Sequence, residues 1–106
     1  MLDMGYKYDS EKLRYDLIPP SAMTALAEGL TMGASKYGDN NWQTIKPDRY
    51  YAALFRHLIA WRNGEINDPE SKLNHLKHVL VNAAFLLELT QPKITKSYIS
   101  DSTDIL

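Results

Sequence analysis

Cysteine is missing from all 106 residues, which excludes disulfides, thiolate zinc sites and cysteine nucleophiles. Long apolar runs are missing too, and the charged N-terminus is unlike a secretory leader, so we expect no membrane partner. Neither sign of charge dominates. Twelve Lys and Arg oppose 13 Asp and Glu, so composition gives no indication of binding to duplex nucleic acid. The length predicts one small domain, and these absences fit a cytoplasmic protein.

Three helices are predicted over about 21–37, 48–63 and 69–90, where apolar residues recur at helical spacing. Residues 1–20 precede them as an extended arm, because paired prolines exclude a helix at the end of that segment. The expected fold is therefore all-α, a helical bundle over 1–92.

Residues 93–106 are expected to form a C-terminal tail. The helix over 48–63 is apolar around most of its circumference, which predicts a second buried side and hence an oligomer.

The predicted helix ends rest on local signals. Gly38 and Gly64 suit the left-handed residue that ends a helix, and Asp68 before Pro69 is typical of a helix start. The expected core stripe of the last helix consists of leucines and one alanine, namely Leu73, Leu76, Leu80, Ala83 and Leu87.

All three histidines fall on the second and third predicted helices. His75, His78 and Asn82 have the spacing i, i+3, i+7, which places them on one helix face, and His57 lies on the preceding helix. Imidazoles so arranged can bind one divalent cation. The plainer alternative is that these histidines are hydrogen-bonded structural residues.

The loop between these helices carries the acids Glu65 and Asp68. Asp68 has a structural explanation as a helix cap, whereas Glu65 has none, so Glu65 is the better catalytic candidate. Three histidines with these acids could hold a divalent ion and position a water for hydrolysis of a phosphoanhydride. Histidine-rich sites suit Mn²⁺, Zn²⁺, Fe²⁺ or Ni²⁺, while Mg²⁺ prefers carboxylates.

Basic and aromatic residues supply a possible nucleotide grip. Cationic side chains could clamp phosphates and aromatic rings could sandwich a purine, although such rings more often cover a core edge. With Asn82, the candidate substrate-binding residues are Lys12, Arg14, Lys36, Tyr37, Asn41, Trp42, Arg49 and Arg56.

Several blocks of the sequence resemble the phage dATP/dGTP diphosphohydrolase N-terminal family, which is MazG-like. The matching blocks are Lys7-Tyr-Asp, Lys12-Leu-Arg-Tyr-Asp-Leu-Ile-Pro-Pro, Lys36-Tyr-Gly-Asp-Asn-Asn-Trp, Arg56-His-Leu-Ile-Ala-Trp-Arg-Asn-Gly-Glu, Asp68-Pro-Glu-Ser and His75-Leu-Lys-His. The resemblance covers roughly 6–90.

This resemblance implies an all-helical dimer or tetramer that hydrolyses a purine deoxynucleoside triphosphate (dGTP or dATP) to monophosphate and pyrophosphate, with Mg²⁺ or Mn²⁺ most expected. A phage-encoded enzyme of this kind would act in the host cell cytoplasm. MazG-like enzymes hold Mg²⁺ with ExxE and ExxD motifs, but the corresponding positions here read Leu54-Phe-Arg-His57 and His75-Leu-Lys-His78.

Three interpretations of that departure remain open. The histidines hold a different metal, or Glu65, Asp68 and Glu28 supply oxygens, or the chain binds a nucleotide or defence signal without cleaving it.

Overall fold

The computed structural model describes residues 11–92. The described residues fall into two units, 11–18 and 19–92. In the described part of the first unit, the single helical turn η1 (Tyr15–Leu17) follows Arg14, whose guanidinium donates two 2.8 Å hydrogen bonds to Asp16. The predicted C-terminal tail and the first ten residues of the predicted arm lie outside the described residues.

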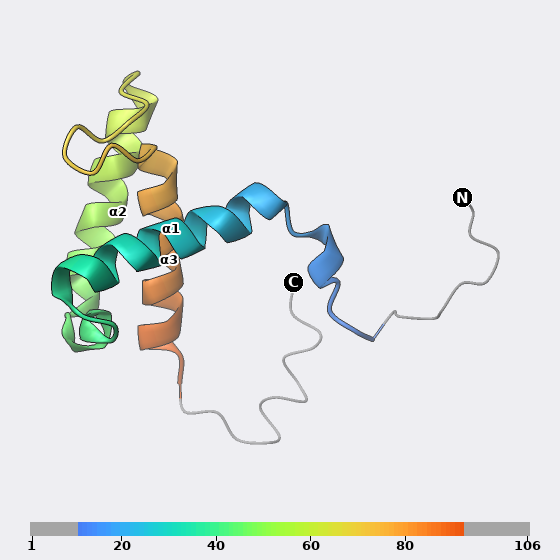
Figure 1. Ribbon diagram of the computed structural model, residues 1–106. Coiled ribbons are helices and arrows are strands. Elements are labelled where there is room, and N and C mark those ends of the chain that lie inside the picture. The colour runs from blue at the N-terminus through green and yellow to red at the C-terminus, as the bar shows by residue number, and fades with distance from the viewer. Residues whose placement is uncertain (1–10, 93–106) are drawn as a thin grey trace, which may run out of the picture. The chain divides into compact units, whose positions relative to one another are not determined.

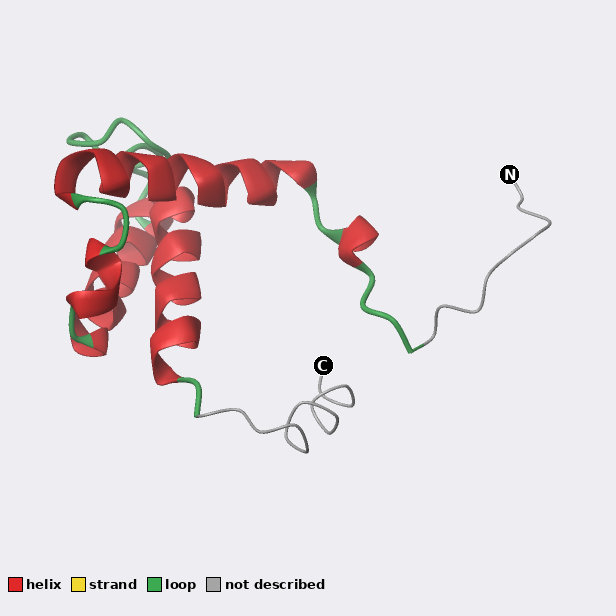
Figure 2. Ribbon diagram, turned by 60° about the horizontal axis from the view of Figure 1, so that its bottom comes forward, coloured by secondary structure: helices red, strands yellow, loops and turns green. Residues whose placement is uncertain are grey.

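The second unit is helical. It contains α1 (Pro20–Tyr37), the short 3₁₀ helix η2 (Asn41–Thr44), α2 (Pro47–Arg62) and α3 (His75–Thr90). Residues 11–92 contain no strand, only one isolated bridge, which confirms the all-α prediction. Helices α2 and α3 lie side by side and antiparallel, and α1 crosses them (Figures 1 and 2).

Proline and glycine set most of the helix ends. Pro20 and Pro47 lie in the first turns of α1 and α2, where a missing backbone N–H costs nothing. Gly38 and Gly64 follow the two helices with φ of 97° and 101°, which a residue with a side chain rarely adopts. The predicted ends at Gly38 and Gly64 are therefore confirmed.

Helix α3 begins six residues later than predicted. Asp68 caps a turn instead of a helix, because its Oδ2 accepts a 2.8 Å hydrogen bond from Ser71 N and Lys72 then turns left-handed with φ of 68°. Asn74 is the actual cap, and its Oδ1 accepts from Leu76 N at 2.8 Å. The predicted helix start at Asp68 was therefore wrong.

The buried side of α3 is its polar side. His75 and Asn82 are 3% and 8% exposed, whereas Leu76 and Leu87 of the predicted core stripe are 38% and 66% exposed. That part of the predicted core was wrong, because α3 is apolar on several sides and spacing alone does not select one. Val81 is buried beside the polar residues and packs against Gly29 of α1.

A row of apolar side chains on α2 remains in contact with solvent. Tyr51, Phe55 and Ile59 are 59%, 42% and 57% exposed, and the first two rings pack together at 4.9 Å between centroids. Among residues 11–92, the only buried apolar side chains are those of Ala25 and Val81, each 7% exposed. The apolar surface of this unit therefore far exceeds what its own core buries.

Candidate metal centre and adjoining cavity

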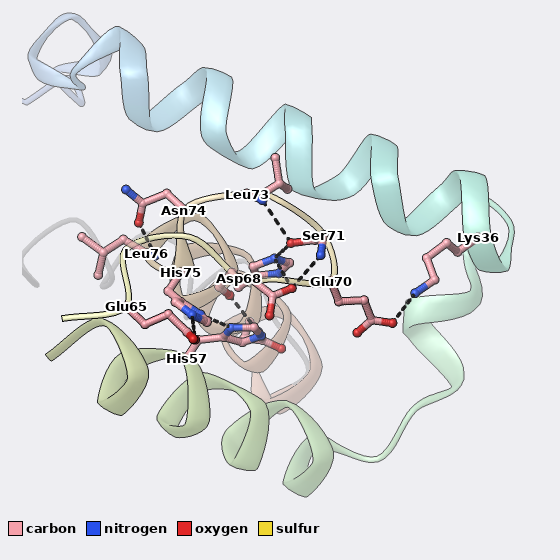
Figure 3. A network of polar contacts seen from close by, with 12 residues as sticks. Lys36, His57, Glu65, Asp68, Glu70, Ser71, Leu73, Asn74, His75 and Leu76 are labelled. Atoms are coloured by element: carbon pink, nitrogen blue, oxygen red, sulfur yellow. Dashed lines mark hydrogen bonds and ion pairs between the residues drawn. The ribbon is translucent and has the colours of Figure 1, made fainter. Parts of the chain in front are cut away.

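The loop after α2 folds back as a short hairpin and brings its acids to the histidines. Asp68 N donates to Leu73 O, and His75 N donates to Ile66 O, both at 2.8 Å. These bonds place Glu65 and Asp68 beside the first turn of α3, which carries His75. His57 reaches the same place from the middle of the antiparallel helix α2 (Figure 3).

His57, His75 and Glu65 form a hydrogen-bonded row. The Nδ1 atoms of the two imidazoles lie 2.8 Å apart, and His75 Nε2 lies 2.7 Å from Glu65 Oε1. An ionised carboxylate only accepts, so His75 carries its proton on Nε2 and its Nδ1 is left as an acceptor. Glu65 therefore sets the tautomer of His75 that a metal would need, as carboxylates commonly do behind metal-binding histidines.

The third histidine closes the other side of the cluster. His78 stacks on His57 with ring centroids 4.2 Å apart and planes 10° from parallel. Its Nε2 lies 2.6 Å from Ser71 Oγ and 4.0 Å from Asp68 Oδ2. Because both neighbours contact the same nitrogen, His78, Ser71 and Asp68 do not form a nucleophilic triad, which needs the acid on the opposite ring nitrogen.

Among residues 11–92, one group of side chains has the geometry of a metal site: His57, Asp68 and His75 each offer a ligand atom, and all three atoms lie within 4.8 Å of one another. The Nδ1 atoms of His57 and His75 lie 2.8 Å apart and share one proton, and a cation bound between them would displace that proton. Two imidazoles and one carboxylate suit a divalent transition metal. Two of the three predicted ligands, His57 and His75, belong to this group, and Asp68 takes the third place in it instead of His78. The residues present therefore fit a divalent metal.

The protonation states of the cluster also favour a cation. Burial lowers the pKa of His57, and the neighbouring imidazoles of His78 and His75 lower it further. Burial likewise lowers the pKa of His78. Burial acts to raise the pKa of Asp68, but hydrogen bonds from Ser71 outweigh this and hold that pKa below its usual range. Neutral imidazoles beside an ionised carboxylate are the forms that bind a metal.

A cavity of about 780 Å³ opens next to the cluster. It lies between the second half of α1, the loop through η2, the first turn of α2 and the middle of α3. His78 belongs to both the cluster and the cavity lining. Lys46 and Arg49 contribute two cationic side chains to the lining, and the Trp42 ring stacks on Phe85 at 4.8 Å between centroids, tilted by 11°.

The cavity collects most of the residues predicted to bind a substrate, and the others lie elsewhere. The predicted residues that line it are Tyr37, Asn41, Trp42, Arg49 and Asn82. Lys36 is absent from the lining and forms an exposed ion pair with Glu70 at 3.8 Å. Arg56 is exposed on α2 and also absent from the lining.

The contacts of three other candidate residues show where each of them lies. Lys12 and Arg14 belong to the first unit, where Arg14 is paired with Asp16. Glu28 pairs with Lys77 at 2.7 Å and is not part of the metal-compatible group.

Among the residues of the cluster and cavity that the sequence analysis did not single out are Lys46, Tyr50, Ser71 and Phe85. Phe85 had a usable signal, since it continues the face of His78 and Asn82 by one further turn of α3. Lys46 and Ser71 had none, because only the tertiary structure brings their loops to the histidines.

No helix within residues 11–92 has the length and apolar character needed to cross a membrane.

Comparison with known proteins gave a family and one relative, and no solved structure matches. The relative is a dATP/dGTP diphosphohydrolase of Salmonella phage PMBT28, 32% identical over 91 residues, which are 86% of this chain and 31% of that protein. The chain thus spans about a third of the length of this relative. A family model described as dATP/dGTP diphosphohydrolase, N-terminal, matches residues 3–97, and the chain therefore belongs to that family.

Proposed function

We propose that this chain hydrolyses a purine deoxynucleoside triphosphate, dGTP or dATP, to the monophosphate and pyrophosphate, with a divalent metal. The observation that carries the proposal is the shared position of His78, which borders both the metal-compatible cluster and the large cavity. Phosphates bound at the cluster would leave the nucleoside in the cavity. The activity for which the phage relative is named is consistent with this reaction.

In this proposal His57, His75 and Asp68 hold the metal, and Glu65 keeps His75 in its binding tautomer. Two nitrogen ligands favour Mn²⁺, Zn²⁺, Co²⁺ or Fe²⁺ over Mg²⁺. Such an ion acts as a Lewis acid toward a phosphoryl oxygen and makes a bound water more acidic.

The chain's own residues bind and orient the substrate. Lys46 and Arg49 would neutralise phosphate charge, and the Trp42–Phe85 pair would offer an aromatic face to the purine. Roles for Lys36, Arg56, Lys12 and Arg14 remain predictions.

The test is incubation of the purified chain with dGTP, dATP and their ribonucleotides, with Mg²⁺ and Mn²⁺ in separate reactions, resolved by ion-exchange chromatography. Monophosphate and pyrophosphate should accumulate in the wild type. Asp68→Asn should abolish both metal binding and turnover, whereas Asp48→Asn, the same change in the first turn of α2, should leave both intact. Intact triphosphate in every reaction would refute the hydrolase.

A second candidate is a protein that binds a purine nucleotide or a defence signal without cleaving it. Its basis is the sequence, because carboxylates are absent at the positions that correspond to the ExxE and ExxD motifs. This candidate predicts recovery of unaltered ligand from a tight complex, with no product in the assay above.

We further propose that the chain is a homo-oligomer of the host cell cytoplasm. The exposed row Tyr51, Phe55 and Ile59 supports a subunit interface along α2, because a unit with so small a core gains stability by covering it. Light scattering at several protein concentrations gives the mass, and a monomer throughout would overturn this part of the proposal.

A further inference from the structure

Asn82 is the buried polar residue of the cavity wall. Only 8% of its surface is exposed, yet it lines the cavity in the middle of α3, one turn beyond His78. Burial of an amide is unfavourable unless its donors and acceptors find partners, so the partners of its two polar atoms indicate what it does.

The orientation of this amide is fixed by the helix. Asn82 Nδ2 donates a 2.7 Å hydrogen bond to the backbone carbonyl of His78. A carbonyl oxygen only accepts, so the amide cannot be reversed without losing this bond, and Oδ1 must point the other way.

Asn82 Oδ1 has no partner among residues 11–92. Every fully enclosed side-chain nitrogen or oxygen in that range does have a partner. Oδ1 is therefore accessible, and Asn82 belongs to the lining of the large cavity. An oriented acceptor, supported by a buried residue, is thus presented to whatever occupies the cavity.

We infer that Asn82 is a specificity-determining residue whose Oδ1 accepts a hydrogen bond from a donor group of the bound nucleoside. This inference rests on the proposed function, because it assumes that a nucleotide fills the cavity. Along α3, His78 lies at the metal cluster and Phe85 stacks on Trp42, so Asn82 lies between the cluster and the aromatic pair. The donor is an N–H of the base or a hydroxyl of the sugar.

If Oδ1 accepts this hydrogen bond, the protein should discriminate against ligands that have lost the donor group. A nucleotide that lacks the donor would leave Oδ1 facing the ligand with neither water nor partner, and such an unpaired acceptor weakens binding by about five- to 100-fold. A ligand that keeps the donor should bind normally. Removal of the amide should abolish this difference between the two ligands.

The test measures binding by calorimetry with Mn²⁺ and non-hydrolysable α,β-methylene triphosphates. The parent ligands are the deoxyadenosine and deoxyguanosine forms. One analogue carries unsubstituted purine, which has no base N–H donor, and another lacks the 3′-hydroxyl. Wild type, Asn82→Ala and the control Asn63→Ala, at the exposed C-cap of α2, are compared.

We expect one analogue to bind at least fivefold more weakly than its parent ligand to both the wild type and Asn63→Ala. The same analogue and its parent should bind Asn82→Ala with equal affinity. The purine analogue would identify a base donor and the 3′-deoxy analogue a sugar donor. Equal binding of all ligands to the wild type would overturn the inference, even if Asn82→Ala does not fold. A wild type that binds these ligands but cleaves no triphosphate would refute only the hydrolase, whereas failure to bind any would refute both.

Discussion

Replacement of Glu65 by alanine separates a positioning role from a catalytic one. The sequence favours Glu65 as a base, but in the structure its Oε1 lies 2.7 Å from His75 Nε2, on the far side of that imidazole from His57. The geometry predicts that Glu65 acts through His75 by fixing its tautomer and ring orientation. Glu65→Ala should therefore weaken metal binding.

The size of the effect follows from exposure. A hydrogen bond to a charged group contributes about 1.5–3 kcal/mol. The His75 side chain is 4% exposed and cannot exchange Glu65 for bulk water, but the Glu65 side chain is 51% exposed, which favours the lower limit. About 1.5 kcal/mol corresponds to a roughly tenfold loss of metal affinity. Glu65→Gln keeps a neutral acceptor and should lose about threefold.

The assay is a Co²⁺ titration followed by visible absorption and calorimetry, which reports the ligand set as well as the affinity. Glu70→Ala is the matched control, because Glu70 is 84% exposed and its ion pair with Lys36 is a long 3.8 Å. Unchanged Co²⁺ affinity in Glu65→Ala would refute the positioning role. Unchanged affinity with lost turnover would show that Glu65 is the base that the sequence suggests.

Three further predictions concern stability and assembly. In metal-free protein, the pKa values of His57 and His78 lie below the unfolded value near 6.5, so the unfolded chain binds more protons than the folded chain as the pH falls through 6.5. Urea melts should therefore show lower stability at pH 5.5 than at pH 8, and equal stability would contradict the lowered pKa values. Gly29→Ala should lower the melting temperature, because the new methyl group collides with Val81. Gly33→Ala, which has open space around its new methyl group, should raise the melting temperature through better helix propensity. The reverse order of melting temperatures would refute the close approach of α1 and α3. Phe55→Glu should dissociate the proposed oligomer without unfolding the helices, whereas the control Lys72→Glu should leave the oligomer intact. An unchanged mass for Phe55→Glu in light scattering would place the interface elsewhere.

The polar interior and the apolar exterior of α3 have one explanation if the proposed function holds. His75 and Asn82 occupy positions that leucine would fill in a helix serving stability alone. Leu87 and the α2 row face outward instead. A unit that commits its core to a site must obtain apolar burial elsewhere, and the proposed subunit interface would supply it.

The sequence determined the local structure and the residue types of the site. Helical periodicity identified the helices, and glycines marked the ends of α1 and α2, because these signals act within one or two turns. Helical spacing also placed His75, His78 and Asn82 on one face. The family resemblance, carried by short blocks of sequence, was confirmed by comparison.

Only the tertiary structure decided which side of α3 is buried and what the acids do. An apolar helix can bury several faces, so the pairing of α2 with α3 was needed to turn His75 inward and leave Leu87 exposed. The turn capped by Asp68 moved the start of α3 to His75, since contacts across the hairpin outweigh the helix-start signal of Asp before Pro. Those same contacts bring Glu65 to His75, ten residues further along the chain, which no periodicity encodes.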